Sequence, residues 1–140
     1  MTGNPASSNA LPPPKGFNPF ADLVGLVFTG YKKGWSQCEL AVRDQIMNPN
    51  RVLHGGAIYA MADTGMGAAL YAELPPGKSC STIEIKISYF KPVTAGMLVC
   101  RTQVVHRGRR IAAVESTVFN DERLVAKASG TFYIFKLKAN

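Results

Sequence analysis

The chain has 140 residues, of which 46% are hydrophobic and 18% are charged, and its formal net charge at pH 7 is +7. This length suits one domain with a sizeable core, and this composition excludes a disordered chain. No apolar run approaches the roughly 18 residues that a membrane-spanning helix needs. The positive charge favours a polyanionic partner, whether nucleic acid, acidic lipid or a phosphorylated cofactor, and does not choose among them.

The N-terminal residues and the cysteines bear on domain organisation and location. Residues 1–16 hold four of the nine prolines and lack the basic and apolar regions of a secretory signal. We therefore expect a flexible tail over residues 1–16, followed by one domain over residues 17–140. The three cysteines follow no metal-ligand spacing, which favours reduced thiols in a cytoplasmic protein.

The first predicted element is a short helix within residues 17–28, FNPFADLVGLVF, in which Pro19 suits the first helical turn. Residues 29–42 are predicted to form a strand pair or one bent strand, with Gly30 and Gly34 marking turns. The polar stretch that follows is predicted to be a loop that leads to the longest helix.

That central helix is predicted to follow His54 and to end before Pro75. Five positions with the spacing of one apolar helical face are Ile58, Met61, Ala62, Gly65 and Ala69. Gly65 and Gly67 each cost about 1 kcal/mol relative to Ala in a helix interior. We therefore expect a packing gain that offsets both glycines.

Asp63 is the only charged residue between Arg51 and Glu73. A carboxylate inside so apolar a segment is costly unless it is paired, hydrated or functional. Asp63 is therefore the first candidate for a catalytic residue.

Four further strands are predicted over residues 82–90, 97–106, 111–119 and 124–135. In the first of these strands, alternation predicts a shared face for Ile83, Ile85, Ile87 and Tyr89. In the last strand, the predicted face contains Leu124, Ala126, Ala128, Gly130, Phe132 and Ile134. Short links require consecutive strands to be antiparallel. The predicted fold is α+β, with an antiparallel sheet of five or six strands wrapped around a long central helix.

These residues form a pattern that resembles the hotdog-fold acyl-CoA thioesterases, in the branch of the phenylacetate-pathway thioesterases. The pattern is Asn48-x5-His54-Gly55-Gly56-x6-Asp63-Thr64, then Ser81-Thr82-x-Glu84-x4-Tyr89-x2-Pro92 and the basic turn at Gly108. The similarity extends over about residues 17–135. It implies a hotdog fold, a homodimer or a dimer-of-dimers tetramer, active sites at the subunit interface, and no metal or redox cofactor.

The resemblance also implies a role for each site residue. The backbone amide of Gly55 would polarise the thioester carbonyl, and Asp63 would act as general base or nucleophile. Asn48 and Ser81 would position the attacking water or the acyl group, and His54 would orient the loop. Asn48, His54 and Gly55 would come from one subunit, with Asp63 and Ser81 from the other.

Coenzyme A carries several phosphate charges, and arginine binds phosphate in a bidentate manner. We therefore expect Gly56 and the basic turn, which contains Arg107, Arg109 and Arg110, to contact coenzyme A. The alternative for this turn is a solvated surface.

The chemistry of thioester hydrolysis fits these residues independently of the resemblance. Negative charge builds up on the carbonyl oxygen during the reaction, and a helix N-terminus presents unpaired N–H groups and a positive dipole end. A carboxylate about two turns further along can accept the proton of a water molecule or attack directly. The predicted function is hydrolysis of acyl-CoA thioesters to free acid and coenzyme A.

Two other functions of a hotdog protein compete with hydrolysis. Hotdog hydratases and dehydratases typically use an Asp/His pair at other positions, and a non-catalytic acyl-CoA-binding protein would not need Asp63. Nucleic-acid binding has only the net charge in its favour, because no recognised motif supports it. The identity of the acyl group stays open between aromatic, hydroxylated aromatic and medium-chain groups.

Overall fold

The computed structural model describes residues 16–139, so the tail predicted over residues 1–16 lies, except for Gly16, outside the described residues. The elements are α1 (Pro19–Val24), β1 (Leu26–Lys32), β2 (Trp35–Ala41), the 3-10 helix η1 (Asp44–Ile46), α2 (Gly55–Tyr71), β3 (Lys78–Tyr89), β4 (Met97–Arg107), β5 (Ile111–Asn120) and β6 (Arg123–Lys136). None of the helices over residues 16–139 is long and apolar enough to cross a membrane.

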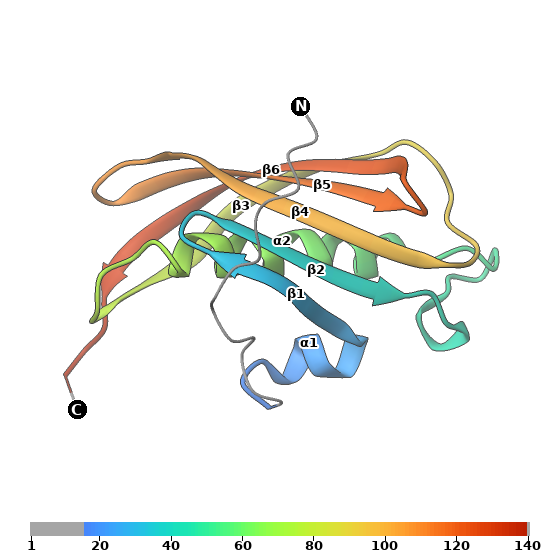
Figure 1. Cartoon of the computed structure of the whole chain (residues 1–140), viewed down its shortest axis with the longest axis horizontal. Coiled ribbons are helices and arrows are strands. Elements are labelled where there is room, and N and C mark those ends of the chain that lie inside the picture. Colours follow the sequence, from blue (N-terminus) through green and yellow to red (C-terminus); the bar gives the residue numbers. More distant parts are fainter. Residues whose placement is uncertain (1–15, 140) are drawn as a thin grey trace.

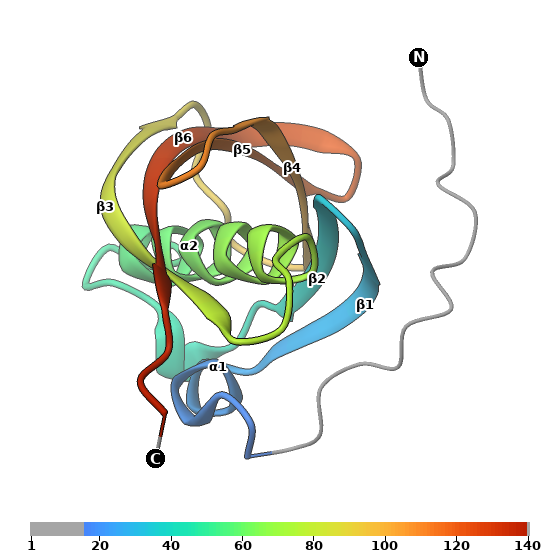
Figure 2. The same ribbon diagram turned by 90° about the vertical axis from the view of Figure 1, so that its left-hand side faces the viewer.

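The six strands form one antiparallel sheet in the order β1-β2-β4-β5-β6-β3. Figure 1 shows α2 lying along the sheet, and Figure 2 shows the sheet curving around α2. Both views place α1 on the side of α2 that faces away from β5 and β6. The predicted α+β fold with a sheet wrapped around one long helix is therefore confirmed, and the sheet has six strands.

The side of α2 that faces the sheet is buried, as its spacing predicts. Four of the five predicted positions, Ile58, Met61, Ala62 and Ala69, lie in the hydrophobic core, and Gly65 is also buried. The packing gain predicted for Gly65 is present, because a Cβ there would lie only 2.7 Å from the Thr102 hydroxyl oxygen. The Ser36 hydroxyl also donates a hydrogen bond to the Gly65 carbonyl oxygen at 2.7 Å. Gly65 thus lets the helix lie close to β2 and β4.

The N-terminal elements differ from the prediction in extent. Asn18 caps α1 by accepting a hydrogen bond from the Ala21 N–H at 3.0 Å. Gly25, with a φ of 94°, ends the helix in the left-handed conformation that glycine adopts without strain. The helix therefore ends at Val24, and residues 26–28, which were predicted to be helical, belong to β1.

The two predicted turns between residues 29 and 42 have different outcomes. Gly34 lies in the turn between β1 and β2 with a φ of 73°, as predicted. Gly30 does not form a turn, because it pairs with Gln37 inside the β1–β2 ladder. The Trp35 ring lies 2.5 Å from the place where a Gly30 Cβ would be, so this glycine makes room for the indole.

Bulges change the side-chain faces of β3 and β6. The register of β3 against β6 shifts between Thr82 and Glu84, and Ile83 is left 54% exposed. A second shift, between β5 and β6, leaves Leu124 42% exposed and buries Val125. The predicted core faces are therefore wrong at Ile83 and Leu124, because each bulge inserts one residue into the alternation.

Candidate active site

Asp63 lies about two turns into α2, on a part of the helix that is only half-buried. Its Oδ1 atom accepts a hydrogen bond of 2.7 Å from the Thr82 hydroxyl of β3. Its Oδ2 atom accepts no hydrogen bond from any residue in the range 16–139. One carboxylate oxygen is thus held in place while the other is available, which suits a general base or a nucleophile.

Asp63 borders a pocket of about 690 Å³ between α2, β1, the start of β3 and the residues that directly precede α1 and follow β6. Its wall includes the aromatic residues Phe17, Phe28, Tyr31 and Tyr71 and the small residues Gly67 and Ala68. Cys80 also lines it, and burial followed by the negative charge of Asp63 raises the pKa of its thiol. The pocket therefore joins one free carboxylate oxygen to a largely apolar space.

The β3 bulge determines which hydroxyl reaches Asp63. The Cys80 thiol donates to the Gly67 carbonyl oxygen at 3.8 Å, and the Thr82 hydroxyl donates to Asp63. Ser81 lies between these two residues, is exposed, and pairs with Tyr133 of β6. Since side chains alternate along a strand, Ser81 points away from α2. The structure therefore brings Thr82, and not Ser81, to Asp63 within this chain.

The N-terminus of α2 holds the second group of predicted residues. His54 is the N-cap, and its Nδ1 atom accepts a hydrogen bond of 2.7 Å from the Gly56 N–H. This bond occupies the Gly56 amide, which was predicted to contact coenzyme A. The Gly55 N–H has no acceptor among residues 16–139. His54 thus caps the helix N-terminus, and among residues 16–139 the Gly55 N–H is a donor without an acceptor at the positive end of the helix.

Tyr89 fixes the position of Gly55 from the side of β3. The phenol hydroxyl donates a hydrogen bond of 2.8 Å to the Gly55 carbonyl oxygen. The ring lies 3.2 Å from the place where a Gly55 Cβ would be. Burial, followed by the neighbouring Tyr59, raises the pKa of Tyr89, so the phenol stays protonated and able to donate. The residue pattern contained Tyr89, but nothing in its spacing indicated this contact.

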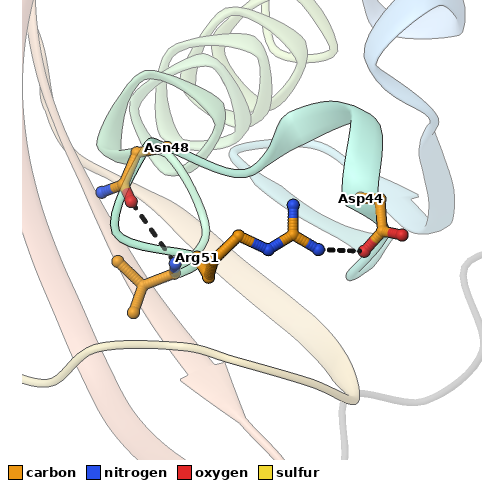
Figure 3. Close-up of polar contacts among 4 residues, drawn as sticks. Asp44, Asn48 and Arg51 are labelled. Atoms are coloured by element: carbon orange, nitrogen blue, oxygen red, sulfur yellow. Dashed lines mark hydrogen bonds and ion pairs between the residues drawn. The ribbon is translucent and has the colours of Figure 1, made fainter.

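Asn48 organises the loop that leads to His54. Its Oδ1 atom accepts hydrogen bonds from the Asn50 N–H at 2.9 Å and the Val52 N–H at 3.3 Å. Figure 3 shows Asn48 and, on the other side of the same segment, the ion pair of Asp44 and Arg51, whose nearest atoms are 2.9 Å apart. Because Oδ1 is occupied, the Nδ2 group, without a partner among the described residues, remains available to a ligand.

One chain does not bring the two groups together. Gly55 and Asp63 are eight residues apart on the same helix, which corresponds to about 12 Å along its axis. A thioester carbonyl at Asp63 is therefore out of reach of the Gly55 N–H of the same chain. The helix N-terminus and Asp63 are therefore two separate polar groups within one chain.

The basic turn lies near the other end of α2. Arg107 donates to the Glu73 carbonyl oxygen at 3.3 Å, and its Nε atom is 3.7 Å from the Glu73 carboxylate. Arg109 and Arg110 are exposed between β4 and β5. Arg107 thus has a structural partner, whereas contacts of the three arginines with coenzyme A stay a prediction. Within residues 16–139, no cluster of three His, Cys, Asp or Glu side chains is arranged to hold a metal ion.

Comparison with known proteins defines the class to which this fold and site belong. Residues 50–127 match the model of the Thioesterase superfamily, so the chain belongs to that family. The predicted hotdog fold and the predicted family are thereby confirmed.

Three relatives illustrate the similarity. A solved structure of a conserved protein from Pseudomonas aeruginosa is 33% identical, covers 84% of this chain and 94% of its own, and has a TM-score of 0.82. A mutant of the phenylacetic acid degradation protein PaaI from Thermus thermophilus is 27% identical over 83% of this chain and 98% of its own, with a TM-score of 0.77. The proofreading thioesterase EntH of Klebsiella pneumoniae is 25% identical over 71% of this chain and 72% of its own length.

Proposed function

We propose that the protein hydrolyses acyl-CoA thioesters and releases the free acid and coenzyme A. Membership of the Thioesterase superfamily supports thioester hydrolysis in general. The observation that carries the proposal is Asp63, whose Oδ1 atom is held by Thr82 while its Oδ2 atom is free beside the apolar pocket. An acyl group can occupy that pocket while its thioester carbonyl lies next to the carboxylate.

The active site is completed by a second copy of the chain. The donor at Gly55 and the acid at Asp63 are too far apart within one subunit, so a homodimer supplies one half-site from each. Strand β3 is at an edge of the sheet and extends from Lys78 to Tyr89. A long open edge can pair with a second strand, and pairing there places a partner next to Thr82. Two such dimers can then associate as a tetramer.

The reaction begins when Oδ2 of Asp63 takes a proton from a water molecule, whose oxygen bonds to the carbonyl carbon. The electron pair of the carbonyl moves onto its oxygen, where the N–H of Gly55 of the partner subunit stabilises the negative charge. The carbonyl then re-forms, the carbon–sulfur bond breaks, and the departing thiolate takes the proton from Asp63. In the alternative route, Oδ2 attacks the carbon, expels the thiolate, and water hydrolyses the resulting anhydride.

The remaining site residues have supporting roles in this proposal. The free Nδ2 group of Asn48 donates to the acyl group or the water, and His54 keeps the helix N-terminus in position. Ser81 points away from Asp63 of its own chain, so any contact with substrate comes from the partner side of the sheet edge. Arg109 and Arg110 are available to the phosphates of coenzyme A, and the chemistry requires no bound cofactor.

Release of free thiol from a panel of acyl-CoAs tests the activity directly. The panel contains aromatic, hydroxylated aromatic and medium-chain acyl groups, with a thiol-reactive dye as the readout. The shared site is tested with Gly55→Pro, which removes the N–H at a helix position that tolerates proline. We expect kcat to fall by about 10²–10³-fold. The matched control is Gly55→Ala, which adds a Cβ against Tyr89 but keeps the N–H.

Subunit mixing separates a shared site from a site within one chain. Inactive Gly55→Pro chains and inactive Asp63→Ala chains are combined, and exchange is verified by mass spectrometry. A heterodimer contains one intact site, so random exchange in a two-fold dimer should restore roughly a quarter of the wild-type activity. Verified exchange without recovery would contradict the shared site, and the absence of thiol release from every acyl-CoA would contradict the activity.

A further inference from the structure

Gly67 is the one feature of α2 that packing within the described chain does not explain. Glycine destabilises a helix interior relative to alanine. At each of the other three glycines of α2, a neighbouring side chain approaches the place where a Cβ would be. These neighbours are Tyr89 at 3.2 Å from Gly55, His54 at 2.8 Å from Gly56 and Thr102 at 2.7 Å from Gly65. Around Gly67, apart from its chain neighbours and the adjacent backbone of α2 itself, no atom of residues 16–139 lies within 4 Å of that place. The packing gain expected at Gly67 is therefore absent within the chain.

Gly67 lines the same pocket as Asp63 and follows it by four residues. Residues i and i+4 lie on one face of a helix, about 6 Å apart along the axis. A Cβ at position 67 would thus project into the pocket one turn beyond the carboxylate. The pocket wall also includes Phe28 and Tyr31 of β1. The missing side chain leaves the pocket wide next to the catalytic acid.

We propose that Gly67 sets the width of the acyl pocket close to the reacting carbonyl, so that the pocket accepts acyl groups with a ring or a branch near the carbonyl. The inference rests on the proposed function for the position of the carbonyl beside Asp63. One helical turn is comparable to the length of the first few carbons of an acyl chain. A straight chain needs little width there, whereas a ring or branch requires it.

Two isomeric ligands isolate the effect of shape. S-hexyl-coenzyme A and S-(2-ethylbutyl)-coenzyme A are thioethers, so neither contains a carbonyl that can be hydrolysed. Both present the same number of carbons to the pocket, so their hydrophobic transfer is nearly equal. The ratio of their dissociation constants, measured by titration calorimetry, therefore reports the shape that the pocket accepts.

We expect the wild type to bind the branched isomer at least as tightly as the linear one. Gly67→Ala should weaken binding of the branched isomer relative to the linear one by about 5-fold or more, because the added atom overfills the widened region. Gly67→Leu should shift the ratio further in the same direction. The same Gly67→Ala variant should raise Tm by about 2–4 °C, because alanine favours the helix. If Gly67 served only to stabilise the fold, its replacement would lower Tm. A higher Tm together with weaker binding of the branched isomer therefore indicates a role in the pocket.

The matched control is Gly65→Ala, which adds the same methyl group two residues away on the sheet side of α2. It should lower Tm, because Thr102 occupies the required space, and should leave the ratio between the isomers unchanged.

Three results would overturn the proposal. The first is an unchanged ratio of dissociation constants in both Gly67 variants, and the second is a wild type that binds neither isomer. The third is a change in the oligomer mass of the Gly67 variants, measured by light scattering, which would assign Gly67 to packing between copies of the chain. A wild type that shows the expected ratios but releases no thiol from any acyl-CoA would support the pocket assignment and contradict the proposed activity.

Discussion

Each of the two sides of α2 contains a glycine, and the two glycines have different surroundings: Gly65 packs against the sheet, and Gly67 lines the pocket. On the sheet side, Gly65 is buried and its carbonyl oxygen accepts a hydrogen bond from Ser36. One turn earlier, the Ala62 carbonyl oxygen accepts a hydrogen bond of 3.2 Å from Ser116, which is itself 2.7 Å from Thr102. Small residues on this side let the sheet hydroxyls reach the helix backbone.

On the open side, Asp63 and Gly67 face a pocket in which no side chain approaches the place of a Gly67 Cβ among the residues described. Among the residues described, the carboxylate accepts a hydrogen bond from Thr82 at Oδ1 and none at Oδ2. The sheet side therefore holds the helix in place, and the open side leaves groups unsatisfied for a ligand. Substitutions should separate these roles: stability should change on the sheet side, and turnover on the open side.

The largest expected effect is that of Asp63→Asn, which keeps the shape of the side chain and removes the basic oxygen. We expect kcat to fall by roughly 10²–10⁴-fold, while coenzyme A binding and Tm stay close to those of the wild type. Thiol release, ligand binding and melting are measured on one preparation. Glu115→Gln on the outer face of the sheet serves as the control. Near-wild-type turnover in folded Asp63→Asn would refute the catalytic role of this residue.

The next effect concerns the hydrogen bond between Thr82 and Asp63. Thr82→Val keeps the volume and removes the hydroxyl, and a hydrogen bond to a charged group contributes about 1.5–3 kcal/mol, so kcat should fall by roughly 10-fold or more. Tm should change little, because the hydrogen bond lies at a half-buried part of the helix. Thr82→Ser should restore kcat. An unchanged kcat in folded Thr82→Val would show that Thr82 does not act through Asp63.

A sheet-side substitution should show the reverse behaviour. Gly65→Ala adds a methyl group 2.7 Å from the Thr102 hydroxyl oxygen, and overpacking of this kind costs typically about 1–3 kcal/mol. Tm and the urea midpoint should fall, while kcat per folded molecule should remain unchanged. If Gly65→Ala lowers kcat without lowering the urea midpoint, the sheet side of the helix contributes to turnover, and the proposed separation of roles is wrong.

The smallest effect is expected at the basic turn. In the double variant Arg109→Ala/Arg110→Ala, the KM for an acyl-CoA should rise by about 2- to 5-fold for each arginine removed. This range corresponds to an exposed charge that contributes up to about 1 kcal/mol to binding. kcat should change little. A truncated thioester that lacks the nucleotide should not respond. An equal rise in KM for both substrates would show that the turn is a solvated surface that does not contact coenzyme A.

The sequence was sufficient for the features that follow from local patterns. The apolar spacing of α2, the alternation in the strands and the turn at Gly34 all depend on residues close together in the chain, and each is present as predicted apart from the faces that the bulges change. The position of Asp63 on the helix followed from the same spacing, because the register of a helix is regular.

Other features depend on contacts between distant strands. The bulge at Ile83 arises from the register between β3 and β6, and alternation along β3 alone could not indicate it. The resemblance pointed to Ser81, whereas the structure brings Thr82 to Asp63. The spacing placed Gly65, but not Gly67, on the apolar face of the helix. The sequence nevertheless predicted a packing gain at both glycines, and the structure shows a close neighbour, Thr102, at Gly65 alone.

Strand β3 contacts the N-terminus and the middle of α2, through Tyr89 at Gly55 and through Thr82 at Asp63. Both contacts are possible only if the number of residues between Thr82 and Tyr89 stays the same. Removal or insertion of one residue between positions 82 and 89 would turn one of the two side chains to the opposite face of the sheet. In a homodimer with shared sites, that change would damage either the acid or the oxyanion donor in both sites. Length variation among relatives should therefore be confined to the turns that flank β3, and the strand itself should keep a constant length.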